Sequence, residues 1–243
     1  MDSIKMRSRI SHIVYFLTLI FAVHCFAEAE QISEEATSIT KAKRLIEQNQ
    51  ISGAIRILET YQTEHPLSIE IPAVEKMLIY CYFHNNDYPM LQAASDRFLF
   101  EHVDDKHADY IAYLRFIGAM HLANGYPYEW LPIERASRDV SAVKDVFLMG
   151  KNFLITYPAS QYASDVAHHL PTLKDTIARS YYLRGEMLMS RGETIGGIRA
   201  FQMVTSQLGD TQYAPQAQAY CDKFQKKLTL VKEYRFNESE KSK

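Results

Sequence analysis

The chain has 243 residues, a formal net charge of −2 and an isoelectric point near 6.5. Because 47% of the residues are hydrophobic, the chain can build one large core or one elongated array without disulfide staples. The balanced charge provides no basic field of the kind that binds nucleic acid. Only nine glycines and eight prolines interrupt the sequence, so its composition favours helices over strands.

The N-terminus is typical of an export signal. Lys5, Arg7 and Arg9 form a positive region ahead of a mostly apolar run at residues 10–23. This run is short for a helix that spans a membrane. We therefore expect residues 1–29 to be a signal region that directs the mature chain out of the cytoplasm.

Two fates of this signal stay open. Cleavage at Ala27-Glu28-Ala29 would release a soluble periplasmic protein, whereas lipidation of Cys25 would anchor the protein to a membrane. His24 stands where a lipoprotein signal normally has a small residue, and this argues against lipidation.

The other two cysteines, Cys81 and Cys221, lie 140 residues apart. In an oxidising compartment they could form a disulfide. Each, however, lies within an apolar helical pattern, which indicates two buried free thiols.

The sequence repeats itself weakly from residue 36 onward. The segment "GAIRIL" at 53–58 recurs as "GGIRAF" at 196–201, and each is expected to open a helix. A reference position, mostly aromatic, recurs at Tyr61, Phe98, Phe153 and Val204. The first step of 37 residues is close to the period of about 34 of a tetratricopeptide helix pair.

The later steps need an insertion and a long helix. Residues 123–139 break the helical period, and residues 160–190 form one long helical pattern despite Pro171. Ser68, Ser160 and Thr211 are expected to cap the helices that follow them.

We therefore predict an all-α, tetratricopeptide-like helical-hairpin solenoid of about five repeats over residues 36–236. Substrate-binding repeats are expected at about 36–122 and docking repeats at about 140–236. A flexible tail is expected at 237–243.

The sequence has no strong catalytic motif. The adjacent His168 and His169 would point about 100° apart on a helix, and no third metal ligand lies near them in the sequence. An enzyme such as a helical-solenoid glycosidase would also need a separate compact domain. We therefore expect a protein that is not an enzyme, with no catalytic residues, no metal site and no cofactor.

Two segments are candidates for binding. In the helical pattern at 107–121, Arg115 lies on the side of small residues, so a substrate groove is predicted with Arg97, Tyr113 and Arg115 as polar anchors. The charged segment "ERASRD" lies within a long loop that also holds Trp130, and long loops in compact arrays are often functional. Its charged residues, expected to act in recognition or docking, are Glu134, Arg135, Arg138 and Asp139.

Four segments together resemble the outer-membrane protein assembly factor D (BamD) family. They are "LQAASDRFLFEHVDDKHADYIAYLRFIGAM" (91–120), "ERASRD" (134–139), "YPASQYASDVAHHLPTLKDTIARSYYLRGEMLMSRGETIGGIRAF" (157–201) and "DTQYAPQA" (210–217). The similarity runs from about residue 40 to residue 225, and the order and spacing of the segments match as well as their content.

The resemblance implies a non-enzymatic lipoprotein on the periplasmic face of the bacterial outer membrane, within the β-barrel assembly machinery. Its partners would be the barrel-forming subunit, accessory lipoproteins and unfolded outer-membrane proteins. Family members recognise such an unfolded protein by the targeting segment at its C-terminus. Cys25 lies where family members carry their lipid, a palmitate-type anchor, so the resemblance favours attachment to membrane lipid. A groove that binds extended apolar peptides would suit this role.

The sequence also departs from the family pattern. Ala136 and Ser137 do not follow the family loop D-R-S-D-R-D, and the arginine expected at position 200 stands at 199. We expect docking on the barrel-forming subunit through Arg191, Arg199 and the charged loop residues. The alternative is a periplasmic repeat scaffold for cell-envelope or division proteins.

Overall fold

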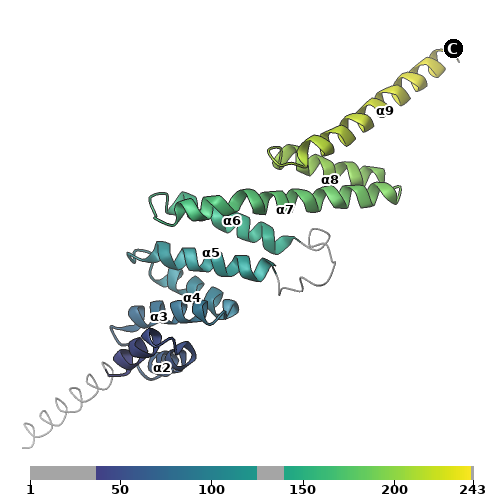
Figure 1. The fold of residues 1–243 in the computed structure, drawn as a ribbon. Coiled ribbons are helices and arrows are strands. Elements are labelled where there is room, and N and C mark those ends of the chain that lie inside the picture. Colours follow the sequence, from purple (N-terminus) through teal and green to yellow (C-terminus); the bar gives the residue numbers. More distant parts are fainter. Residues whose placement is uncertain (1–36, 125–139, 242–243) are drawn as a thin grey trace, which may run out of the picture. The chain divides into compact units, whose positions relative to one another are not determined.

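The computed structural model describes residues 37–124 and 140–241, and within these residues it contains helices and no strand (Figure 1). A first helix covers residues 37–47. The helices that follow are α2 (Ile51–Glu64), α3 (Ile71–His84), α4 (Tyr88–Glu101), α5 (Ala108–Asn124), α6 (Ser141–Thr156), α7 (Ala163–Ser190), α8 (Thr194–Gln207) and α9 (Ala214–Lys241). In the described part of the chain, no helix is both long enough and apolar enough to cross a membrane.

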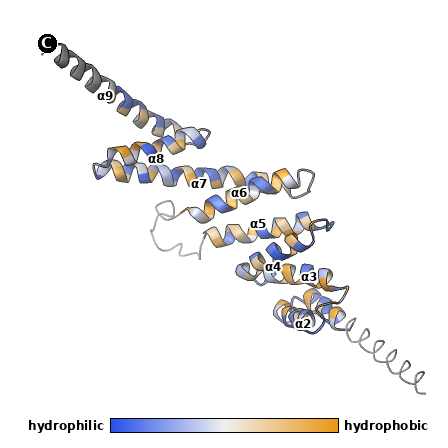
Figure 2. Ribbon diagram, turned by 180° about the vertical axis from the view of Figure 1, so that it is seen from behind, coloured by the Kyte–Doolittle hydropathy of each residue, from blue (hydrophilic) through white to orange (hydrophobic). Residues whose placement is uncertain are grey.

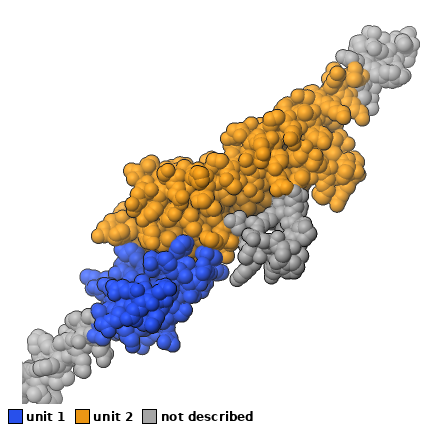
Figure 3. All heavy atoms as spheres, viewed as in Figure 1, with its two compact units in different colours: residues 1–90 blue, residues 91–243 orange. Residues whose placement is uncertain are grey.

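The chain divides into two compact units, one up to Met90 and one from Leu91 onward (Figure 3). In the first unit α2 packs against α3. In the second unit each helix packs against the next along the chain, from α5 to α9. The prediction of an all-α, tetratricopeptide-like solenoid is confirmed, because consecutive helices form adjacent hairpin-like pairs.

The repeat seen in the sequence is also a repeat of structure. Tyr61, Phe98, Phe153 and Val204 are all buried. The backbone carbonyl of each accepts a hydrogen bond from the N–H four residues later, at 2.8–3.0 Å, where α2, α4, α6 and α8 end. The four positions therefore mark the same turn in successive repeats, as the sequence predicted.

The expected capping serines and threonine act within these turns and not as N-cap residues. The Oγ of Ser68 accepts the N–H of Glu70, and the Oγ of Ser160 accepts the N–H of Tyr162. The corresponding helices, α3 and α7, begin one residue later. Thr211 differs, because its hydroxyl donates back to the carbonyl of Leu208. The capping prediction was therefore wrong by about two residues: the serines order the turn ahead of the helix.

A second kind of turn joins the two helices of a hairpin, and it is polar. Asn49, Asn86 and Gly192 occupy the same place in these turns, with φ of 58°, 57° and 80°. Asparagine and glycine tolerate this left-handed conformation better than other residues. Each allows the chain to reverse within three residues, so that "GAIRIL" and "GGIRAF" fall near the starts of α2 and α8 as predicted.

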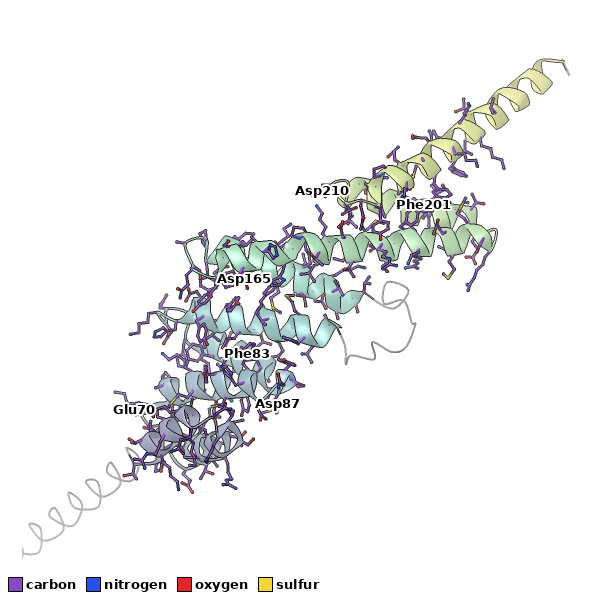
Figure 4. The ribbon with its side chains drawn as sticks, viewed as in Figure 1. Glu70, Phe83, Asp87, Asp165, Phe201 and Asp210 are labelled. Carbon is purple, nitrogen blue, oxygen red and sulfur yellow. The ribbon has the colours of Figure 1, made fainter. Side chains whose placement is uncertain are left out.

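The most extensive helix–helix contact of the second unit joins α7 and α8, and α9 packs on α8. Phe201, labelled in Figure 4, is fully buried there. Its ring stacks on Tyr220 at 4.4 Å with an interplanar angle of 6°. A β-carbon at Gly185 would lie 2.7 Å from the Phe201 ring. A β-carbon at Gly197 would lie 3.0 Å from the carbonyl oxygen of Gly185. These glycines therefore let α7 and α8 approach closely.

The two longest helices differ from the sequence prediction in one respect. Helix α7 has 28 residues and includes Pro171, as expected from the pattern at 160–190. Helix α9 also has 28 residues and reaches Lys241, so it continues into residues 237–241 that were expected to form a flexible tail. Hydrophobic and hydrophilic residues alternate around the helices (Figure 2), as expected for helices that bury only one side.

Both described cysteines are free thiols. Cys81 is buried in α3, and this burial raises the pKa of its thiol to about 11. Cys221 is half-buried in α9, where burial and then the neighbouring Asp222 raise its thiol pKa. Free thiols in helices were predicted, with full burial correct only for Cys81.

Candidate functional site

Two hollows lie on the surface of the second unit. The first, of about 430 Å³, is lined by residues from α4, α5 and α6: Leu99, Ala112, Arg115, Asp145, Leu148, Met149, Asn152, Phe153, Thr156 and Tyr157. The second, of about 470 Å³, lies between the α4–α5 and α6–α7 turns. It is lined by Val103, Asp104, Asp105, Lys106, Ala108, Asp109, Thr156, Tyr157, Pro158, Ala159 and Ser160.

Thr156 and Tyr157 line both hollows, so the two lie next to each other along one hollowed surface. We call it the α6 groove. It follows α6 from Asp145 to the helix end and continues to Ser160 in the turn beyond. At 1.5 Å per residue, the stretch from Asp145 to Thr156 is about 17 Å long. This length corresponds to about five residues of an extended peptide.

One wall of the α6 groove is a stripe of α6 itself. Asp145, Met149, Asn152 and Thr156 recur at helical spacing on this side. The residues that α6 buries, Val146, Gly150 and Phe153, lie on another stripe that packs into the core, with Phe153 also reaching the groove floor. Because the core stripe already holds α6 in place, the groove stripe is available to a ligand.

The opposite wall is a stripe of α5 made mainly of small residues. Ala108, Ala112 and Arg115 recur at intervals of four and three residues. Gly150 keeps α6 close to this helix, because a β-carbon there would lie 2.8 Å from the ring of Phe116. The hollow therefore results from the small side chains of α5 and not from separated helices.

Arg115 lies in the groove, but its charge is already paired. Its guanidinium forms an ion pair with Asp96 of α4, although the Nε–H does not point at that carboxylate and makes no hydrogen bond. The side-chain amide of Gln92 donates to the backbone carbonyl of Arg115 at 2.7 Å. Both contacts tie α4 to α5, so Arg115 supports the wall as well as lining it.

The other two predicted anchors lie elsewhere. The hydroxyl of Tyr113 donates to Asp165 of α7 at 2.8 Å, and its ring stacks on Tyr162 at 4.5 Å. Burial, followed by the hydrogen bond and charge of Asp165, raises the pKa of Tyr113 to about 12. Asp165 is labelled near the start of α7 in Figure 4. Arg97 is exposed on α4 and does not line the groove. The structure thus places only Arg115 in the groove.

Sequence reasoning missed the α6 wall. Asp145, Leu148 and Asn152 were not singled out, yet they line the groove. One signal was present: Leu148 lies off the stripe formed by Val146, Gly150 and Phe153, and its side chain is 53% exposed. A leucine that faces away from the buried stripe of its own helix indicates a contact surface.

The predicted docking residues lie on α7 and α8. Arg191 is the C-cap of α7 and is exposed, and Arg199 is exposed on α8 beside the buried Ala200. Ile195, one helical turn before Arg199, is 66% exposed. The exposed face of α8 therefore offers a cation next to an apolar side chain. Cys25 and the charged loop residues Glu134, Arg135, Arg138 and Asp139 lie outside the described residues.

These stacked hairpins, with an open groove along one helix, define a tetratricopeptide-like solenoid. Residues 33–240 match the YfiO family, described as "Outer membrane lipoprotein", and the chain belongs to this family, whose curated relatives are named outer membrane protein assembly factor BamD.

Three of these relatives illustrate the similarity. The protein of Vibrio cholerae is 27% identical over 161 residues, which cover 66% of this chain and 67% of the relative. That of Pasteurella multocida is 24% identical over 74% of this chain and 69% of its own length. That of Buchnera aphidicola is 22% identical over 77% of this chain and 82% of its own length.

Proposed function

We propose that the chain is a non-enzymatic assembly factor for outer-membrane β-barrel proteins. It works at the periplasmic face of the outer membrane, within the β-barrel assembly machinery. There it binds extended segments of unfolded outer-membrane proteins and docks on the barrel-forming subunit. Family membership supports the assembly role, because the relatives bear that name.

The observation that carries the binding role is the α6 groove. It joins apolar residues such as Leu148 and Met149 to polar residues such as Asn152 along about 17 Å of helix. An unfolded barrel segment has an unpaired backbone and side chains that alternate in character. A groove with interleaved apolar and polar residues fits such a segment.

The docking surface is the exposed face of α8 with the C-cap of α7. Arg199 and Arg191 supply positive charge there, and Ile195 supplies an apolar contact. An interfacial ion pair that loses one partner typically costs about 2–5 kcal/mol, enough to dissociate a complex of moderate affinity. We also propose a docking role for the charged loop residues Glu134, Arg135, Arg138 and Asp139, as the family resemblance implies.

Affinity purification from bacterial membranes tests the assembly role. We expect wild-type protein to recover the barrel-forming subunit and accessory lipoproteins. Arg199→Glu and Arg191→Glu should reduce that recovery with unchanged helicity, while Lys43→Glu, an exposed reversal on the first helix, should not. Recovery of division or cell-envelope proteins without the barrel subunit would instead support the scaffold role.

Membrane attachment through Cys25 is a separate part of the proposal. Each buried CH₂ contributes about 0.8 kcal/mol, so several acyl chains hold a protein stably at a membrane. Intact-mass measurement should give a species that begins at Cys25 with added lipid mass. An unmodified species that begins at Glu30 would show that the protein is released into the periplasm.

A further inference from the structure

The α6 groove has an excess of negative charge. Four carboxylates and two cations line it, which gives a net charge of −2: Asp104, Asp105, Asp109 and Asp145 against Lys106 and Arg115. At Tyr157, which lines both hollows, burial first and the charge of Asp109 second raise the pKa of the hydroxyl.

Neighbouring cations do not cancel this excess. Arg115 is paired with Asp96, whose carboxylate lies outside the groove lining. Lys144 precedes Asp145 on α6, but its ammonium donates to the hydroxyl of Tyr181 on α7 at 2.9 Å. Lys151 lies 5.9 Å from the ring of Phe147, off the groove stripe. The charges of Arg115, Lys144 and Lys151 are therefore engaged with other groups, and Lys106 is already counted in the net charge of −2.

The four carboxylates differ in how far they are already engaged. Asp105 accepts the backbone N–H of His107, and Asp109 accepts the hydroxyl of Ser160 at 2.7 Å. Asp104 and Asp145 are exposed and line opposite parts of the groove. These two carboxylates are available to a charged ligand at both ends of the groove.

Apolar side chains stand exposed along the same groove. Val103 lines it and is 72% exposed. Leu148 also lines it and is 53% exposed. Large apolar side chains grouped in this way on a soluble surface mark a site of contact. The occupant must therefore contribute apolar surface as well as positive charge.

We propose that the α6 groove binds an extended segment of about five residues in which apolar side chains alternate with lysine or arginine. The inference rests on the proposed function and names the chemistry of the segment that this site selects. Alternation suits the groove, because successive side chains of an extended chain point to opposite sides, toward carboxylates and toward apolar residues. The same negative charge disfavours a segment that ends in a free carboxylate.

Matched peptides test this chemistry. Three fluorescein-labelled hexapeptides, blocked at both ends, carry Leu, Phe and Val at alternate positions and Lys, Ser or Glu at the others. Fluorescence anisotropy with the full mature chain should show that the Lys peptide binds about tenfold more tightly than the Glu peptide at low salt. The reason is that the Lys peptide can form two or three exposed ion pairs with the groove carboxylates, which the Glu peptide cannot form. The difference should shrink at 0.5 M salt. Equal affinity for all three peptides, or binding of none, overturns the proposal.

Charge reversal in the groove provides the second arm. The double variant Asp104→Lys and Asp145→Lys should bind the Glu peptide more tightly than the Lys peptide. Glu193→Lys is the matched control, because Glu193 is an exposed N-cap of α8 that makes no capping hydrogen bond and lies outside the groove. It should leave the preference unchanged. An unchanged preference in the double variant would place the peptide elsewhere.

This test separates the groove from the assembly role. If the barrel-forming subunit co-purifies but the peptides show no charge preference, the groove inference fails and the assembly role stands. If the peptides show the preference but no barrel subunit is recovered, the groove binds cationic segments in another context. A concentration-dependent dimer that the double variant abolishes would instead identify a second copy of the chain as the occupant.

Discussion

Two neighbouring hairpins of the second unit, α5–α6 and α7–α8, both bring their helices together at glycines but differ in how completely the surface between the helices is filled. Between α7 and α8, Gly185 and Gly197 let the helices touch, and Phe201 fills the space between them. Between α5 and α6, Gly150 brings the helices together, but Ala108 and Ala112 leave the adjoining surface open as the α6 groove. Small residues thus close one hairpin and hollow the other.

The difference lies in what faces the small residue. At Gly185 a large ring from the partner helix occupies the space, so the core is continuous. At Ala112 the facing residues, Met149 and Asn152, line the hollow and leave it open. The closed hairpin can therefore present only its outer face, with Arg199, to a partner, whereas the open hairpin can receive a segment of chain. The predictions below test this contrast.

The largest expected effect is the loss of the ring that closes the α7–α8 hairpin. Phe201→Ala should lower the free energy of unfolding by about 3–5 kcal/mol, because the side chain is fully buried and stacks on Tyr220. Leu148→Ala, in the open hairpin, should change it by less than about 0.5 kcal/mol because that side chain is more than half exposed. Urea denaturation measures both, and comparable losses would contradict the contrast.

A smaller effect is expected from glycines that differ only in what surrounds them. Gly185→Ala places a methyl group 2.7 Å from the Phe201 ring and should cost about 1–3 kcal/mol. Gly196→Ala, on the next helix, meets only the end of Leu188 at 3.4 Å and should be neutral or stabilising by up to about 1 kcal/mol. Thermal unfolding of the pair checks this. A destabilised Gly196→Ala would mean that α8 is less tolerant than its contacts indicate.

Much of the fold was predictable from the sequence because it depends on local periodicity. Tyr61, Phe98 and Phe153 could be aligned by eye, and each proved to be buried at the same turn. The length of α7 followed from its helical pattern, and Pro171 inside the helix does not end it, because α6 and α8 pack against α7. The extension of α9 to Lys241 was not predicted because the residues from Asn237 onward are polar and have no apolar pattern.

The site was less predictable because it depends on which helices face one another. Arg115 was identified from its small neighbours, but its pairing with Asp96 needs α4 and α5 to be adjacent. Tyr113 was expected to line the groove, but its hydroxyl donates a hydrogen bond to Asp165 of α7 instead. The far wall, with Asp145 and Asn152, comes from a helix that follows residues 125–139, and no local pattern links it to α5.

Removing the Tyr113 hydroxyl should cost less and leave the groove intact. Tyr113→Phe should lower the free energy of unfolding by about 1 kcal/mol through loss of the bond to Asp165. A double-mutant cycle with Asp165→Asn should give an interaction free energy between the two side chains that accounts for most of that loss. Affinity for the cationic hexapeptide should not change. A weakened affinity would return Tyr113 to the role of a groove anchor.

The same hydroxyl gives a pH dependence. Its pKa in the folded chain, about 12, lies above the ordinary value of 10, so its stabilisation is complete below pH 10 and is lost as the pH rises through 12. The difference in unfolding free energy between wild type and Tyr113→Phe should therefore decrease over this alkaline range. A difference that stays constant to pH 12 would show that Asp165 does not hold the proton on Tyr113.

The smallest effect is expected at an exposed ion pair on the closed side. Asp210, labelled in Figure 4, lies in the turn between α8 and α9 and forms an ion pair with Lys174 of α7. The hydrogen bond from Lys174 holds the pKa of Asp210 below its ordinary value of 3.8. A carboxylate with a lowered folded pKa adds stability that is present above its ordinary pKa and is lost as the pH falls through the folded pKa.

Lys174→Met should therefore lower the melting temperature slightly at pH 7 and less at pH 3. Because the pair is exposed, 0.5 M salt should also reduce the difference. Lys226→Met, an exposed lysine on α9, is the control and should show neither dependence. If Lys174→Met and Lys226→Met shift the melting temperature alike at every pH, the ion pair does not stabilise the closed α7–α8 hairpin. The stability of this hairpin would then come from the buried contacts of Phe201.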